Sequence, residues 1–186
     1  FMTSSLAPVA DISCGGKACV ALKIDGTAEA WGDSVMGNAG DASSGSANLT
    51  NIAHISCGGY PCVALKNDGT AEAWGHASFG GDASSVDLTN VAHISCGSKV
   101  CVALKNDGTA EAWGDARFGG DASSANLTNV AHISCGGYAC VALKNDGTAE
   151  AWGYASRGGD ASSVDLTNVA HISCGSKVCV ALKIDG

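Results

Sequence analysis

Histidine and cysteine recur together along this chain, and both residue types can bind metal ions or take part in catalysis. A His-x-x-Cys motif occurs four times, with its histidine at His54, His93, His132 and His171. Zinc needs four nitrogen or sulfur ligands that converge on one point. Residues three apart in a β-strand point to opposite faces, so in a strand the two side chains of this motif diverge. The spacing therefore argues against a zinc site, and we expect neither a metal nor a cofactor.

The cysteines suggest a different chemistry, because they form pairs whose members are five residues apart. The pairs are Cys14/Cys19, Cys57/Cys62, Cys96/Cys101, Cys135/Cys140 and Cys174/Cys179. Directly opposite residues of a hairpin have Cβ atoms roughly 4.5–5.5 Å apart, and a small twist reaches the about 3.5–4.5 Å that a disulfide needs. We expect a disulfide in every pair and hence an oxidising compartment, extracellular or an organelle lumen. Reduced, buried thiols are the alternative, and metal ligation is a weaker one.

Carboxylates are spread along the chain as evenly as the cysteines. One glutamate stands in each Ala-Glu-Ala-Trp motif, at Glu29, Glu72, Glu111 and Glu150. A catalytic site needs its nucleophile, base and orienting group at one place. Identical copies separate such groups, so the sequence indicates a protein that is not an enzyme.

The glycine- and serine-rich segments that follow each Trp-Gly pair hold a second set of carboxylates. They are Asp82, Asp87, Asp121, Asp160 and Asp165. Carboxylate oxygens are ligands for Ca²⁺, but the Asp-x-Asp-x-Asp-Gly spacing of a calcium loop is absent. Turn formation explains these residues more simply.

All these residues recur because the chain is a tandem repeat. The first cysteines of the pairs are spaced by 43, 39, 39 and 39 residues, and the tryptophans Trp31, Trp74, Trp113 and Trp152 follow the same spacing. The first repeat carries four extra residues in its linker. We divide a single repeat domain into units 1–40, 41–81, 82–120, 121–159 and 160–186, of which the last lacks its Thr-Ala-Glu-Ala-Trp-Gly segment.

Each repeat is expected to form a three-stranded antiparallel meander. Two short β-favouring runs flank the first turn, and Asp68-Gly69 is typical of a two-residue type I′ hairpin turn. This turn would place Cys57 opposite Cys62, and Val63 opposite Trp74. A face of small groups, which includes the cysteines, would then pack against a bulky face that carries the tryptophan. Repetition of that contact predicts an all-β propeller or open arc of about five blades, with a parallel β-helix as the alternative.

The repeat pattern I-S-C-G-x-x-x-C-V-A-L-K-x-D-G-T-A-E-A-W-G resembles the regulator of chromosome condensation repeat. The compact 39-residue unit is similar to the three-stranded repeats of a bacterial propeller that inhibits β-lactamases. The resemblance implies a propeller, usually of seven blades, so we expect a fragment of a longer array or an arc.

This sequence also departs from the family pattern. The family's histidine before the second strand is replaced by Pro61, Val100, Ala139 and Val178, and no counterpart of the β-wedge used for nucleotide exchange is visible. The departure weakens any transfer of exchange-factor activity to this chain.

Composition limits the classes of partner. The net charge of −8 and the isoelectric point of about 4.8 argue against nucleic acid and anionic membranes. No apolar run approaches the roughly 20 residues of a membrane span, so we expect no direct insertion. No signal peptide is visible at residues 1–11, and Phe1 before Met2 suggests a processed or partial chain. Asn48 and Asn126 begin Asn-Leu-Thr sequons that a secretory route could glycosylate.

The positions at which the repeats differ carry aromatic and basic residues, which are enriched at protein interfaces. The candidates for partner binding are Tyr60, Phe79, Arg117, Phe118, Tyr138, Tyr154 and Arg157. An ordinary variable surface is the alternative. We interpret the chain as a non-enzymatic protein–protein interaction or scaffold module, such as a peripheral accessory subunit of an organellar membrane or photosynthetic assembly. A metal- or calcium-binding array, and an enzyme inhibitor or exchange-factor-like propeller, are the alternative functions.

Overall fold

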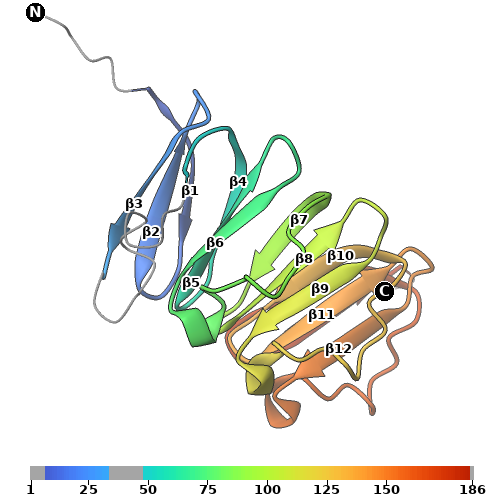
Figure 1. Ribbon diagram of the computed structural model, residues 1–186. Coiled ribbons are helices and arrows are strands. Elements are labelled where there is room, and N and C mark those ends of the chain that lie inside the picture. The colour runs from blue at the N-terminus through green and yellow to red at the C-terminus, as the bar shows by residue number, and fades with distance from the viewer. Residues whose placement is uncertain (1–6, 34–47, 185–186) are drawn as a thin grey trace, which may run out of the picture.

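The structure of the protein is a computed structural model, which describes residues 7–33 and 48–184 (Figure 1). The described chain forms four three-stranded sheets and one two-stranded sheet. The strands of the first two sheets are β1 (Val9–Cys14), β2 (Ala18–Lys23), β3 (Ala28–Gly32), β4 (Ile52–Cys57), β5 (Pro61–Lys66) and β6 (Ala71–Gly75). Those of the other three are β7 (Val91–Cys96), β8 (Val100–Lys105), β9 (Ala110–Gly114), β10 (Val130–Cys135), β11 (Ala139–Lys144), β12 (Ala149–Gly153), β13 (Val169–Cys174) and β14 (Cys179–Lys183).

The predicted all-β architecture of small repeated antiparallel blades is therefore confirmed, and consecutive strands pair within each blade. The extra residues of the first linker and the expected boundary between residues 40 and 41 lie outside the described residues. Nowhere in the described ranges is a helix long and apolar enough to cross a membrane.

The first hairpin of each blade has the predicted register. Cys57 lies opposite Cys62, and Ile55 opposite Ala64. The Gly58 N–H donates to the Pro61 carbonyl at 2.8 Å and closes a tight turn. This turn sets the cysteines of each pair directly across from each other.

The second hairpin corrects the expected turn and register. The Lys66 N–H donates to the Thr70 carbonyl at 2.8 Å, and the Gly69 N–H donates to the Lys66 carbonyl at 3.0 Å. Gly69 has φ +80°, whereas Asp68 is absent from the residues with positive φ. The loop thus has three residues with one left-handed glycine, and the two-residue type I′ turn was wrong. The register moves by one residue, so Trp74 lies opposite Cys62 and not Val63.

This register changes which side chains share a face. Tryptophan now shares a face with the cysteine pair, and that face packs on the valine, leucine and alanine face of the preceding blade. In the first junction, Ile55, Cys62 and Trp74 pack against Val20 and Leu22. The same contact recurs at the next two junctions. A bulky face does pack on a smaller one, as predicted, but the disulfide belongs to the bulky face.

Buried tryptophans also hydrogen-bond to the preceding blade. The indole N–H of Trp113 donates to the Gly80 carbonyl at 2.9 Å, and that of Trp152 to the Gly119 carbonyl at 3.0 Å. Both glycines are left-handed residues that end a short 3₁₀ turn, with φ +101° and +105°. Trp31 in the first blade is 48% exposed.

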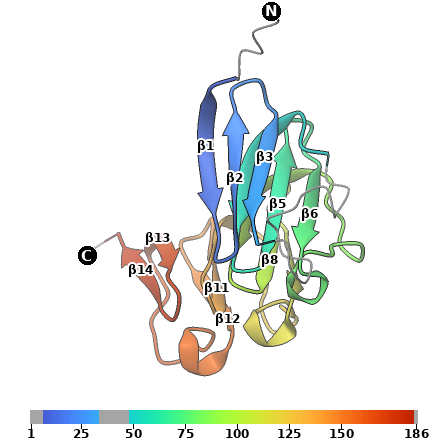
Figure 2. The ribbon, with the colours of Figure 1, turned by 90° about the vertical axis from the view of Figure 1, so that its left-hand side faces the viewer.

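The first strands of successive blades lie side by side along the inner side of the arc. Side-chain hydroxyls link them: the Cys96 N–H donates to Ser56 Oγ at 3.0 Å and the Cys135 N–H to Ser95 Oγ at 2.9 Å. A Cβ on Gly97 would lie 2.1 Å from the Gly136 carbonyl oxygen, so the backbones approach too closely for a side chain. Figures 1 and 2 show the blades as a row whose first and last members lie at opposite ends.

Candidate partner-binding surface

One edge of the arc gathers the first hairpin turns of the blades and the segments that follow each Trp-Gly pair. Pro61 at the start of β5 pairs with Gly75 at the end of β6, which fixes both to the same edge. Three 3₁₀ turns begin there: η2 (Ala77–Phe79), η3 (Ala116–Phe118) and η4 (Ala155–Arg157). They lie along the lower edge of the molecule in Figure 2. We call this edge the aromatic rim.

The second blade supplies the first group of rings on the aromatic rim. The ring centroids of Tyr60 and Phe79 are 5.0 Å apart, and His76 stacks on Phe79 at 4.2 Å. Tyr60 comes from the β4–β5 turn, and Phe79 ends η2. Each ring remains partly exposed. His76 was not among the predicted binding residues, because a lone histidine in a variable loop gives no sequence signal.

Lys99 joins this group to the next blade. Its ammonium lies 4.4 Å from the Phe79 ring centroid and 4.7 Å from that of Phe118. A cation over an aromatic face gains about 0.5–1 kcal/mol at an exposed site. The sequence analysis missed Lys99 as a site residue, although it occupies the turn position that Tyr60 and Tyr138 hold in alternate repeats.

The third and fourth blades complete the strip. Phe118 and Tyr138 stack at 5.0 Å, and the Arg157 guanidinium carbon lies 4.5 Å from the Tyr138 ring centroid. Tyr154 meets the edge of Tyr138 at 6.1 Å and is 44% exposed. Arg117 lies 5.8 Å from the Phe118 centroid. The structure therefore brings all seven predicted partner-binding residues into one strip.

The cations of the strip differ in their partners. Arg117 pairs with Asp115 at 2.9 Å, and this carboxylate raises the pKa of the guanidinium. Within residues 7–33 and 48–184, Lys99 and Arg157 form no ion pair and contact aromatic rings instead. Their positive charges remain open to an anionic group of a partner.

The ten cysteines lie in the five predicted pairs. The sulfur atoms of each pair are 2.05–2.08 Å apart, and the Cα atoms 4.0–4.1 Å. No cysteine of the described chain is free. Such a density of cysteine pairs is typical of an oxidising environment.

The repeated histidines form a column on the inner strands. Ring centroids are separated by 5.6 Å from His54 to His93, 5.6 Å from His93 to His132, and 6.0 Å from His132 to His171. Burial, followed by the charges of His54 and His132, lowers the pKa of His93. Burial also lowers the pKa of His132, with a smaller effect from His171. Among the described residues, no three His, Cys, Asp or Glu side chains are grouped so as to hold a metal ion.

Acidification is therefore expected to destabilise the fold. Because folding lowers the pKa of His93 below its ordinary 6.5, the unfolded chain binds the proton first as the pH falls. The histidine contribution is constant above pH 6.5 and becomes destabilising as the pH falls below it. Urea midpoints at pH 8, 6.5 and 5.5 should show this decline, and His93→Gln should flatten it. An identical decline in the variant would show that other groups cause it.

The aspartates of the linkers act as turn residues. Asp82 Oδ1 accepts the Ser84 N–H at 2.9 Å, and Asp87 Oδ1 accepts the Thr89 hydroxyl at 2.7 Å. The Thr89 hydroxyl and the ammonium of Lys105 lower the pKa of Asp87 to about 2. Asn126 replaces this aspartate in its repeat and accepts the Thr128 hydroxyl at 2.7 Å. Asn48 and Asn126 are exposed, and their glycosylation stays a prediction.

Solved structures with the same arrangement of blades identify the fold. Yeast Prp20p superimposes with a TM-score of 0.69 over 99% of this chain and 58% of its own, at 16% identity. The fold is that of the RCC1-like propellers. Human WBSCR16 gives 0.66 over 98% of this chain and 59% of its own, at 19% identity. The ectodomain of the Physcomitrella patens receptor kinase CR4 gives 0.67 over 97% and 50%, at 19% identity.

The chain thus spans 50–59% of the length of these RCC1-like structures. No protein-family profile and no curated protein matches the sequence. The RCC1-like resemblance predicted from the repeat pattern is confirmed at the level of the fold.

Proposed function

We propose that this chain is a non-enzymatic protein-interaction module that binds a partner through the aromatic rim. The observation that carries the proposal is the continuous strip in which aromatic rings alternate with Lys99 and Arg157. Rings supply apolar area with few rotatable bonds, and open cations favour acidic groups on the partner. Because the strip crosses three blades, it offers a partner an extended contact and not a single pocket.

The RCC1-like structures support an interaction role. Yeast Prp20p binds Gsp1p and histones, and a second structure of the yeast protein shows it in complex with Kap60. The five cysteine pairs support an oxidising compartment, such as the extracellular space or an organelle lumen. A peripheral subunit of a larger assembly, organellar or photosynthetic, fits a module that binds but does not catalyse.

Substitutions within the strip test the proposal. A photo-crosslinking residue at position 79 would identify the partner in a native extract, and binding would then be measured with purified proteins. Lys99→Ala and Phe118→Ala should each weaken binding by about tenfold or more, because both sit at the centre of the strip. Ser85→Ala, an exposed linker residue away from the rim, is the matched control. Equal affinity of all three variants would reject the aromatic rim as the binding surface.

A further inference from the structure

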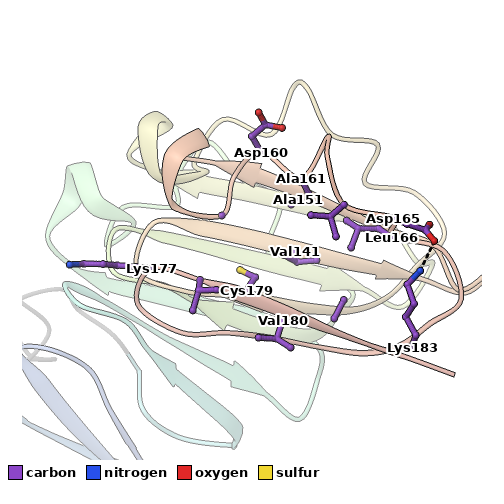
Figure 3. A pocket seen from close by; sticks show the side chains of 14 residues that line it. Val141, Ala151, Asp160, Ala161, Asp165, Leu166, Lys177, Cys179, Val180 and Lys183 are labelled. Atoms are coloured by element: carbon purple, nitrogen blue, oxygen red, sulfur yellow. Dashed lines mark hydrogen bonds and ion pairs between the residues drawn. The ribbon is translucent and has the colours of Figure 1, made fainter. Parts of the chain in front are cut away.

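The last described blade has an open strand edge beside a pocket. β14 pairs with β13 alone among the described strands, whereas the second strand of each earlier blade has a partner on both sides. A pocket of about 350 Å³ lies along β14, between it and the fourth blade. Its lining includes Val141, Ala151, Gly158, Cys179 and Lys183 (Figure 3).

The earlier blades show what fits such a place. In the fourth blade, Trp152 packs on Val102 and Ala112 of the third blade, and its indole donates to the Gly119 carbonyl. Val141, Ala151 and Gly158 hold the corresponding positions under β14. A Cβ on Gly119 would lie 3.7 Å from Cys140 Sγ, and one on Gly158 the same 3.7 Å from Cys179 Sγ. The floor, the acceptor carbonyl and the disulfide thus recur without the indole.

The charges at the far end of the pocket show the same relation. In the third blade, Lys105 pairs with both Asp87 at 2.9 Å and Glu111 at 2.7 Å. Lys183 pairs with Asp165 at 2.5 Å, and this is its one ion pair in the described chain. Glu111 is the third-strand residue opposite Ala103, and Ala181 holds that place on β14. A second carboxylate therefore has a defined position beside Lys183.

We propose that the edge of β14 and this pocket bind, by strand addition, an extended segment of another polypeptide that carries Glu-x-Trp. The segment pairs antiparallel with β14, its tryptophan fills the pocket and donates to the Gly158 carbonyl, and its glutamate, two residues earlier, meets Lys183. Main-chain hydrogen bonds to an open edge give such binding its affinity, and side-chain pockets give it specificity. This site is separate from the aromatic rim and does not depend on the function proposed for it.

A blocked peptide Thr-Ala-Glu-Ala-Trp-Gly tests the proposal on the whole chain. Titration followed by amide NMR should give saturable shifts at Cys179–Lys183, with none at Ala18–Lys23 of the first blade. The Trp→Ala peptide should bind at least about tenfold more weakly, because it loses the buried ring. The Glu→Gln peptide should bind about threefold more weakly to the natural chain and equally well to Lys183→Met, as a double-mutant cycle requires.

Two results would overturn the inference. One is equal binding of a scrambled peptide of the same composition, which would show that no defined strand register exists. The other is concentration-dependent self-association that protects the Cys179–Lys183 amides from exchange and that the peptide does not inhibit. That result would assign the edge to a second copy of this chain.

Discussion

Replacing Trp113 with alanine lowers the free energy of unfolding by about 3–5 kcal/mol. The side chain is 4% exposed, packs on Val63 and Leu65 of the preceding blade, and donates its indole N–H to the Gly80 carbonyl. Truncation removes this apolar contact, leaves a cavity between two blades and leaves a buried carbonyl without its donor. Guanidinium unfolding followed by circular dichroism measures the change.

Trp31→Ala is the matched control for this substitution. Trp31 has the same place on the third strand and lies opposite Cys19, as Trp113 lies opposite Cys101. Because Trp31 is 48% exposed, its truncation should cost about 1 kcal/mol or less. Equal losses in the two variants would mean that stacking between blades does not account for the stabilisation by tryptophan.

Reduction of the disulfides is expected to abolish the cooperative fold. Each bridge closes a short loop and contributes about 2 kcal/mol by the chain-entropy relation. Five such contributions are comparable with the whole stability of a typical domain, about 5–15 kcal/mol. Thermal melts with and without a phosphine reductant measure the effect, because the reductant does not titrate other groups of the chain.

Thiol counting provides the control for reduction. The unreduced, denatured chain should incorporate no alkylating reagent, and the reduced chain should incorporate ten equivalents, one per cysteine. A melt that stays unchanged after full reduction would contradict the expected contribution of the bridges. A double variant of Cys96 and Cys101 to alanine should lose about 2 kcal/mol, which isolates one bridge.

The sequence predicts the fold better than the register of the second hairpin. The tight first turn leaves one alignment that sets Cys57 opposite Cys62, so this pair could be read from spacing alone. Asp68-Gly69 is compatible with two turn geometries, because both place glycine at positive φ. The structure selects the three-residue loop, in which Asp68 accepts both the N–H and the hydroxyl of Thr70. That one-residue difference placed the tryptophan on the wrong face.

The binding surface was predictable in membership but not in arrangement. Differences between repeats pointed to Phe79, Phe118 and Tyr138, because residues outside the stacking contacts are free to vary. The sequence does not show that Lys99 lies between two phenylalanines of successive blades, since this depends on the distance between blades. The pocket beside β14 could not be predicted either, because it forms between a strand edge and the preceding blade.

The two edges of the arc carry opposite electrical character. At the edge opposite the aromatic rim, every lysine is paired with a carboxylate, through Lys23, Lys66, Lys105, Lys144 and Lys183. Exposed aspartates of the Asp-Gly turns add further negative charge there, at Asp25, Asp68, Asp107 and Asp146. The molecule therefore has a permanent dipole along its strands. In the field of an acidic partner it rotates so that the aromatic rim arrives first, and dissolved salt weakens that torque.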